Sequence, residues 1–144
     1  MFLVAQAAGS WMLEQGQGGS IINTASIYGV MAPDQRIYEG SHYLGRAINT
    51  PASYSASKAA VIGLARHLAT YWAHHNIRVN VLTPGGIESG QNETFSRNYS
   101  ARVPLGRMGN ASELPGALRY LASDSSSVAT GRPRLVAGAL ACWS

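Results

Sequence analysis

The 144-residue chain is poor in charge. Charged residues make up 12% of it, and Lys58 is its only lysine. The formal net charge of +4 therefore comes from arginines, which are scattered from Arg36 to Arg134 without a dense basic run. Nucleic-acid-binding domains usually concentrate their basic residues in one run or on one face. The composition therefore argues against a nucleic-acid partner.

Cysteine and long apolar runs are also scarce. Cys142 is the only cysteine and cannot form an internal disulfide, which is compatible with the reducing cytoplasm. The apolar stretches are interrupted well short of a membrane span, and residues 1–4 lack the basic start and cleavage site of a signal peptide. The sequence predicts a cytoplasmic protein without a membrane partner.

The sequence also lacks a glycine-rich turn between a strand and a helix. In dinucleotide-binding domains the helix N-terminus after such a turn receives the pyrophosphate. Gly16, Gly18 and Gly19 form a Gly-x-Gly-Gly run, but it follows a helical pattern and precedes a strand pattern. That context is the reverse of the required one. We interpret these glycines as a helix stop and a loop.

What the chain does contain is a strand–helix–strand pattern. Residues 19–26 form a short apolar run that ends at a serine, and residues 77–86 form a second run that is broken by a Pro-Gly pair. Between them, residues 53–75 carry apolar side chains at helical spacing. With 46% hydrophobic residues, the pattern predicts one α/β domain in which helices cover both faces of the sheet.

The helical segment carries a pair with chemical meaning. Lys58 follows Tyr54 by four residues, and residues at this spacing share one face of a helix about one turn apart. An ammonium beside a phenol oxygen favours the ionised phenol and makes the tyrosine a usable acid or base. The alternative is that both side chains merely decorate an exposed helical turn, so the pair has to be judged in context.

The context closely resembles the short-chain dehydrogenase/reductase family. Ser26, Tyr54 and Lys58 match the family's catalytic serine and its Tyr-x-x-x-Lys motif, and residues 80–85 match the strand and Pro-Gly turn next to the nicotinamide. The resemblance covers residues 1–131. Residues 102–107 and 120–124 also match, in the segments that flank the family's penultimate helix.

The resemblance implies the C-terminal part of a Rossmann-type, doubly wound parallel sheet. In the family the glycine-rich motif and a helical catalytic asparagine would precede Met1. We therefore expect residues 1–144 to form part of a single domain, its catalytic half, without the N-terminal dinucleotide-binding half. In general pattern the chain resembles the 3-oxoacyl-carrier-protein reductases.

The resemblance also assigns chemical roles. The implied activity is interconversion of a secondary alcohol and a ketone with NAD or NADP, in which Tyr54 is the proton donor or acceptor. Lys58 would keep the phenol acidic and bind the nicotinamide ribose, and Ser26 would stabilise charge on the substrate oxygen. Tyr54 would contact the cofactor as well. The Pro-Gly turn and the residues after it would contribute further cofactor-binding residues: Pro84, Gly85, Ile87 and Ser89. Ser89 stands where the family usually has threonine, and a plain loop residue is equally compatible with it.

Two helices carry broad apolar surfaces. In the family, the helices corresponding to residues 2–15 and 55–75 pack against their copies in a second subunit. The resemblance therefore implies a homodimer or homotetramer. Simple packing of both helices in the core of one subunit is the alternative.

Two departures from the family pattern stand out. Ser26 and Tyr54 are 28 residues apart, about twice the usual spacing, and the extra residues, around 33–51, border the expected substrate cleft. Arg36, His42 and the tyrosines of this insert are candidates for contacts with a polar or anionic substrate, whereas a surface loop without such a role is the alternative. Residues 132–144 diverge from the family and include Pro133, which leaves the last strand in doubt.

The histidines at 42, 67, 74 and 75 lack the spacing of a metal site, so no metal is expected. The functional alternative is a truncated, catalytically inactive chain that acts at most as an oligomerising subunit. The sequence alone names neither the substrate nor the preferred nicotinamide cofactor.

Overall fold

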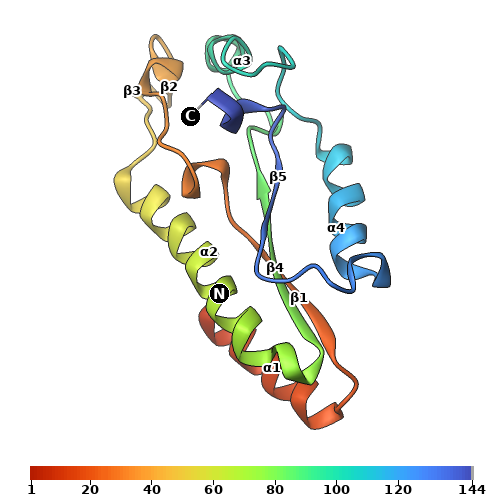
Figure 1. Cartoon of the computed structure of the whole chain (residues 1–144). Helices are drawn as coiled ribbons and strands as arrows, with labels where there is room; N and C mark the ends of the chain where they lie inside the picture. The colour runs from red at the N-terminus through yellow and green to blue at the C-terminus, as the bar shows by residue number, and fades with distance from the viewer. Residues whose placement is uncertain (144) are drawn as a thin grey trace.

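A three-stranded parallel sheet forms the centre of the computed structural model, which describes residues 1–143 and the side chains as far as Cys142 (Figure 1). The strand order is β1 (Gly19–Thr24), β4 (Ile77–Pro84), β5 (Pro133–Val136). In the register Gly19 lies opposite Ile77, and Val81 lies opposite Pro133. The predicted parallel α/β sheet is therefore confirmed.

The central strand β4 is covered on both faces. Its successive residues Val79, Asn80, Val81, Leu82 and Thr83 are all buried, although neighbouring side chains of a strand point to opposite faces. This burial explains why the sequence shows a nearly continuous apolar run here instead of alternation.

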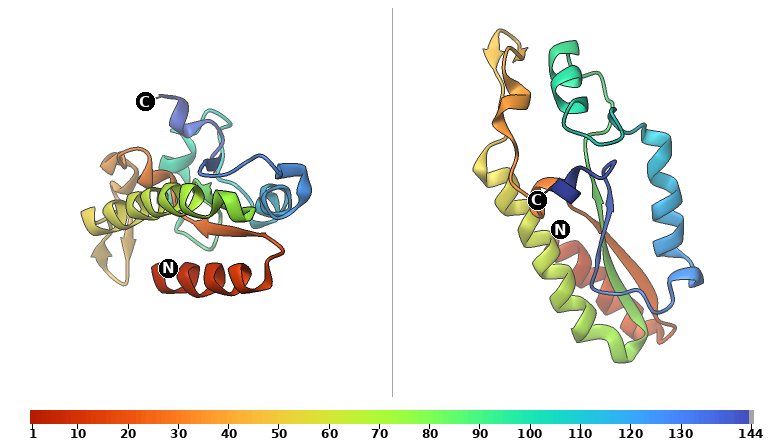
Figure 2. Two further views of the ribbon diagram at one scale, coloured as in Figure 1. Left: turned by 60° about the horizontal axis from the view of Figure 1, so that its bottom comes forward. Right: turned by 45° about the horizontal axis from the view of Figure 1, so that its top comes forward.

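Helices α1 (Phe2–Gln15) and α2 (Ala52–Trp72) lie on one face of the sheet (Figure 2). They form the larger core with the strands, in which Trp72 of α2 packs over Gly9 of α1 so closely that a Cβ on Gly9 would lie 2.1 Å from the indole ring. The 3-10 turn η3 (Ala73–His75) continues α2, so the helical pattern over residues 53–75 is confirmed.

Helix α4 (Leu114–Ala122) lies on the opposite face. Ser20 of β1 and Arg78 of β4, which are partners in the register, both donate side-chain hydrogen bonds to the carbonyl oxygen of Leu121, each at 2.9 Å. The connections β1–α2–β4 and β4–α4–β5 each lead to the next strand in the same direction across the sheet. Their helices, however, lie on opposite faces of the sheet. The two connections therefore have opposite hands, whereas most such connections are right-handed.

A second, smaller core lies beyond the carboxyl ends of the strands. It joins η1 (Ile27–Gly29), η2 (Gln35–Tyr38), α3 (Glu93–Ser100) and the C-terminal turn η6 (Leu140–Trp143). The hairpin of β2 (His42–Tyr43) and β3 (Arg46–Ala47) extends from it. The remaining 3-10 turns flank α4: η4 (Ala111–Glu113) and η5 (Asp124–Ser126).

The C-terminal segment does form a last strand. Pro133 is the first residue of β5, the position where a missing N–H is tolerated, and the strand pairs with residues 81–84 of β4. Beyond it, the chain folds back, and Leu140 is buried against the second core. The doubt that Pro133 raised is thereby resolved in favour of a strand.

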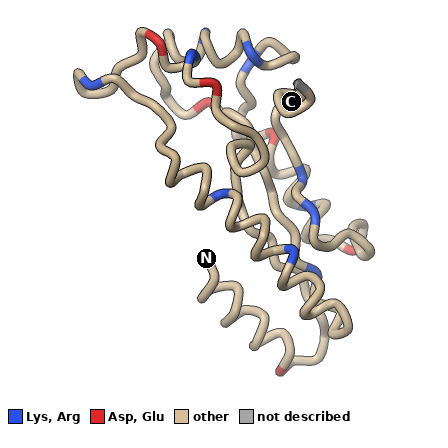
Figure 3. Tube along the Cα trace, turned by 60° about the vertical axis from the view of Figure 1, so that its left-hand side comes forward, with Lys and Arg blue, Asp and Glu red and all other residues tan. Residues whose placement is uncertain are grey.

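Basic and acidic positions are spread along the chain, and the basic ones form no continuous stretch (Figure 3). In the part of the chain that is described, no helix has the length and apolarity required to cross a membrane.

Candidate active site

The N-terminal half of α2 passes directly over the end of β1. Gly29 of η1 makes this approach possible, because a Cβ there would lie 2.7 Å from the carbonyl carbon of Lys58. Lys58 Nζ donates a hydrogen bond of 3.4 Å to the carbonyl oxygen of Thr24, the last residue of β1. The close packing thus fixes the lysine against the carboxyl end of the sheet, where open α/β folds place ligands.

Tyr54 lies one turn before Lys58, as their spacing predicts. The Lys58 ammonium is 5.5 Å from the centroid of the Tyr54 ring, and 40% of the tyrosine is exposed. The pair does not lie on a featureless surface, because Tyr54 borders a cleft of about 360 Å³.

Ser26 borders the same cleft. It lies two residues after the end of β1 and is 8% exposed, and its Oγ accepts a 3.3 Å hydrogen bond from the backbone N–H of Tyr28 in η1. A hydroxyl in this arrangement keeps its own proton available to donate. The structure therefore brings Ser26 and Tyr54 to one cavity from segments 28 residues apart.

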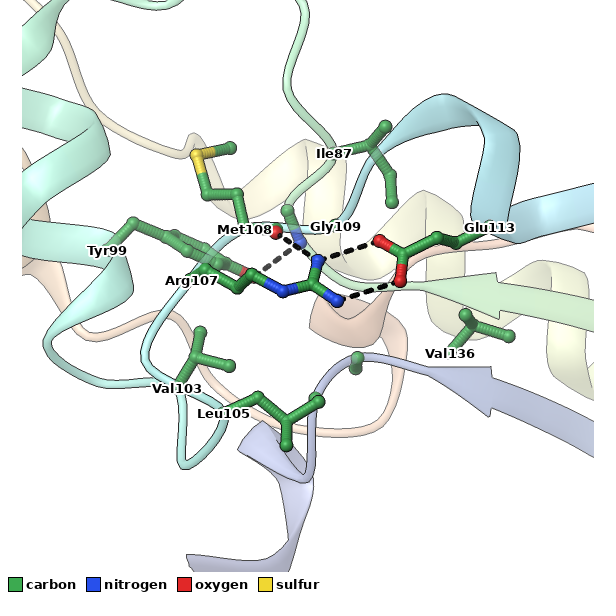
Figure 4. Close-up of a pocket in the computed structure, with 12 residues that line it drawn as sticks. Ile87, Tyr99, Val103, Leu105, Arg107, Met108, Gly109, Glu113 and Val136 are labelled. Carbon is green, nitrogen blue, oxygen red and sulfur yellow. Dashed lines mark hydrogen bonds and ion pairs between the residues drawn. The ribbon is translucent and has the colours of Figure 1, made fainter.

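The Pro-Gly turn after β4 forms the far wall of the cleft. Gly86 donates its N–H to the hydroxyl of Tyr99 on α3 at 2.6 Å, and a Cβ on Gly86 would lie 2.5 Å from that ring. Gly109 brackets the turn by donating to Gly86 and accepting from Glu88, each at 2.8 Å. The backbone of the turn is therefore held on two sides; Figure 4 labels Tyr99 and Gly109, the residues that hold it.

A second, smaller cavity of about 100 Å³ lies behind this turn (Figure 4). At its edge Arg107 donates to both carboxylate oxygens of Glu113, at 2.7 and 2.8 Å. Glu113 also accepts from the backbone N–H of Asn110 at 2.7 Å. These bonds, those from Arg107 first, lower the pKa of Glu113 from 4.5 to about 2.

The predicted cofactor-binding residues do not all lie together. Gly85 and Ile87 line the cleft beside Tyr54, whereas Pro84 ends β4 and pairs with Val136 of β5. Ser89 lies outside this cleft, where its Oγ accepts a 3.0 Å hydrogen bond from Gln91. The expected role of Ser89 stays a prediction, and the other roles likewise rest on position alone.

The residues of the insert that line the cleft are not its basic candidates, Arg36 and His42. Arg36 pairs with Asp34 at 2.8 Å, and His42 lies on the exposed hairpin, so neither lines the cleft. Tyr38 does line it. Sequence reasoning did not single out Asn49, which lines it too, because no local pattern distinguishes a cleft residue within an irregular segment.

Two further tyrosines, which the motifs did not single out, line the cleft. Burial is the main cause that raises the pKa of Tyr28 and of Tyr99 above the ordinary value of 10.0. Their phenols therefore stay protonated at neutral pH and serve as hydrogen-bonding groups. Tyr54 differs from both, because the ammonium of Lys58 lies 5.5 Å from the centroid of its ring.

The serine after β1, the tyrosine of the Tyr-x-x-x-Lys pair and the turn after β4 are features on which the family resemblance rests, and the structure brings these three to one cleft. The family model described as enoyl-(acyl carrier protein) reductase matches residues 1–138. The chain belongs to the short-chain dehydrogenase/reductase family.

Known relatives are similar over nearly all of this chain. D-arabinitol 2-dehydrogenase (ribulose-forming) of Candida tropicalis is 36% identical over 151 residues, which cover 99% of this chain and 49% of the relative. A short-chain dehydrogenase structure from Leptospira borgpetersenii with bound NAD⁺ is 40% identical, with a TM-score of 0.87, covering 96% of this chain and 51% of that one.

A gluconate 5-dehydrogenase from Burkholderia cenocepacia, solved in complex with NADP and tartrate, is 33% identical, with a TM-score of 0.83. That match covers 98% of this chain and 51% of the other. The chain thus spans about half the length of its relatives, and its sheet corresponds to the C-terminal part of a Rossmann-type fold.

Proposed function

We propose that this chain is the catalytic part of an NAD(P)-dependent oxidoreductase that interconverts a secondary alcohol and a ketone. The observation that carries the proposal is the position of Tyr54, which borders the cleft beside Ser26 while Lys58 Nζ lies 5.5 Å from its ring. In this proposal the arrangement supplies a proton donor, a cation beside it and a second hydroxyl for the substrate oxygen.

In the reduction direction, Tyr54 gives its phenolic proton to the carbonyl oxygen of the substrate as that oxygen gains negative charge. Ser26 donates a hydrogen bond to the same oxygen and holds the carbonyl in line with the phenol. Lys58 stabilises the resulting phenolate until a proton returns from solvent. In the oxidation direction the phenolate accepts the proton of the alcohol.

In this proposal a nicotinamide ring would bind on the Gly85–Ile87 side of the cleft. Gly86 leaves room there for the Tyr99 ring that holds the turn, and Gly85 and Ile87 border the open space opposite Tyr54. A bound nicotinamide would supply the hydride. Gly85, Ile87 and Lys58 would hold that end of the cofactor. The described residues provide no glycine-rich helix start for its pyrophosphate.

The proposed substrate class is a polyhydroxylated, sugar-derived ketone or alcohol. Two relatives carry names of this kind, an arabinitol dehydrogenase and a gluconate dehydrogenase. The cleft supports the proposal because Tyr28, Tyr38, Asn49 and Thr50 give it a polar wall. A substrate hydroxyl could exchange hydrogen bonds with this wall, and a plain alkyl ketone has no such group.

The proposal also includes a homodimer or homotetramer built through α1 and α2, in the cytoplasm. Phe2, Leu3, Val4 and Trp11 of α1 are all more than half exposed, with Leu3 at 73%. Such a patch of large apolar side chains is typical of a protein interface. Its burial against a second copy agrees with the arrangement that family resemblance implies.

The test is Tyr54→Phe in the full-length protein. The variant keeps the ring but removes the proton, so ketone reduction should fall by roughly 10²–10⁴-fold while NADH and NADPH affinities stay nearly unchanged. Stopped-flow reduction assays and calorimetric titration measure the two quantities. Tyr43→Phe, on the exposed hairpin, is the matched control. Retention of most of the wild-type kcat by Tyr54→Phe would refute the proposed role.

A further inference from the structure

The insert between Ser26 and Tyr54 is a folded cap and not a free loop; we call residues 33–51 the cap. The ring of Tyr38 stacks on Phe95 of α3 with centroids 5.5 Å apart. Asn98 of α3 donates through Nδ2 to the carbonyl oxygen of Glu39 at 3.1 Å. The cap is therefore attached to α3 by both apolar and polar contacts.

A hydrogen-bonded pair of side chains, in which Ser41 is buried, adds to this attachment. Ser41, which is 1% exposed, bonds through its Oγ to both amide atoms of Asn92, at 3.1 and 2.7 Å. The same Asn92 side chain accepts from the N–H of Phe95 and so caps the start of α3. One asparagine thus fixes the cap and the helix in a single arrangement.

The end of the cap is fixed where it enters the cleft. The carbonyl oxygen of Thr50 accepts a 3.4 Å hydrogen bond from Gln35, and the Thr50 hydroxyl is hydrogen-bonded to that of Tyr38. Helix α2 begins two residues later, at Ala52. The backbone at Asn49, immediately before Thr50, is therefore held close to the first turn of α2, which carries Tyr54.

Asn49 carries an available polar group into the cleft. Its side chain is exposed, lines the cavity and has no hydrogen-bond partner among residues 1–143. In contrast, the hydroxyls of Tyr38 and Thr50 bond each other, and Gln91 bonds to Ile87 and Ser89. A carboxamide offers both a donor and an acceptor, which matches the two roles of a substrate hydroxyl.

We propose that Asn49 is a specificity-determining residue whose amide binds a hydroxyl of a polyhydroxylated substrate beside the reacting carbonyl, and that the cap exists to hold it there. This inference rests on the proposed oxidoreductase function. A site that is built to hydrogen-bond a hydroxyl discriminates strongly against an analogue that lacks it.

The test compares ketones of equal chain length in the full-length protein with NADH and with NADPH. D-ribulose and L-sorbose are the polyhydroxylated probes, and 2-pentanone and 2-hexanone, with the carbonyl at the same carbon, are their plain counterparts. We expect Asn49→Ala to lower kcat/KM for the hydroxylated ketones by about tenfold or more, and to change the plain ketones less than about twofold.

His42→Ala is the matched control, because His42 lies on the exposed hairpin of the same cap and outside the cleft. It should leave all four rates within about twofold. Equal losses for both ketone classes in Asn49→Ala, or no loss in either, would overturn the specificity role while leaving the oxidoreductase intact. Absence of turnover of all four ketones by the wild-type protein would overturn the proposed function itself, and this inference with it.

Discussion

The two cores of this molecule are built in different ways. The core between the sheet and helices α1 and α2 consists of aliphatic residues and Trp72, which recur with the periods of strands and helices. The core beyond the strand ends gathers single residues from separate segments, such as Ile37 from the cap, Tyr99 from α3 and Leu140 near the C-terminus. Regular backbone ladders organise the first, whereas isolated side-chain hydrogen bonds organise the second.

This difference matches a division of chemical tasks. Tyr54 and Lys58 lie on α2, whose far end is anchored in the first core, so close packing sets the position of the pair to which we assign proton transfer in the proposed function. The residues that would contact the rest of a substrate lie on the second core, where a few hydrogen bonds decide the arrangement. If the proposed function holds, substitutions in the cap would change substrate preference without disturbing the proposed proton donor.

Of the substitutions considered for the two cores, the largest loss of stability is expected at Trp72, in the first core. Trp72 is 4% exposed and fills the space between α2 and Gly9, so Trp72→Ala removes a large buried side chain from the first core. We expect the free energy of unfolding of the full-length protein to fall by about 3–5 kcal/mol. Urea unfolding followed by circular dichroism measures it, with His74→Ala on the exposed turn η3 as the control. A loss below about 1 kcal/mol would show that the first core does not depend on this packing.

The same difference explains what the sequence could predict. The strand ending at Ser26, the helix from residue 53 and the strand ending in Pro-Gly follow from periodicity, because local spacing and burial agree there. The pairing of Tyr54 with Lys58 follows from helix geometry alone. These are the parts of the site that lie on regular elements.

The rest depends on contacts between residues far apart in the chain. Asn98 and Glu39 are 59 positions apart and Ser41 and Asn92 are 51 apart, and no local pattern indicates either pair. Arg36 was a candidate for substrate contact because of its charge, but its guanidinium forms an ion pair with Asp34 and does not line the cleft. Asn49 gave no signal, because its role depends on where the folded cap places it.

The second core is tested by Tyr99→Phe, for which we expect an intermediate effect. The substitution keeps the ring but removes the oxygen that accepts the N–H of Gly86 at 2.6 Å, and so leaves a partly buried donor unpaired. We expect a loss of about 1–3 kcal/mol in the free energy of unfolding and weaker nicotinamide binding, because the turn beside Ile87 loosens.

Urea unfolding and calorimetric titration with NADH and NADPH of the full-length protein measure both effects. Tyr71→Phe, on the exposed side of α2, is the matched control. Unchanged cofactor affinity in Tyr99→Phe would show that the turn is fixed by Gly109 alone.

The smallest effect is expected at Glu113, whose ion pair with Arg107 sits on the surface of the same region. Because folding lowers the Glu113 pKa from 4.5 to about 2, the unfolded chain binds more protons between these values. The carboxylate therefore stabilises the fold above about pH 4.5, and this contribution is lost as the pH falls toward 2.

Glu113→Gln should lower the urea midpoint slightly at pH 7, and the difference from the wild type should shrink on acidification. High salt should also shrink it, because exposed ion pairs are screened. Glu14→Gln, at an exposed position of α1, is the control. If the difference in urea midpoint between Glu113→Gln and the wild type stays constant from pH 7 to pH 3, the charge of the Glu113 carboxylate does not contribute to stability.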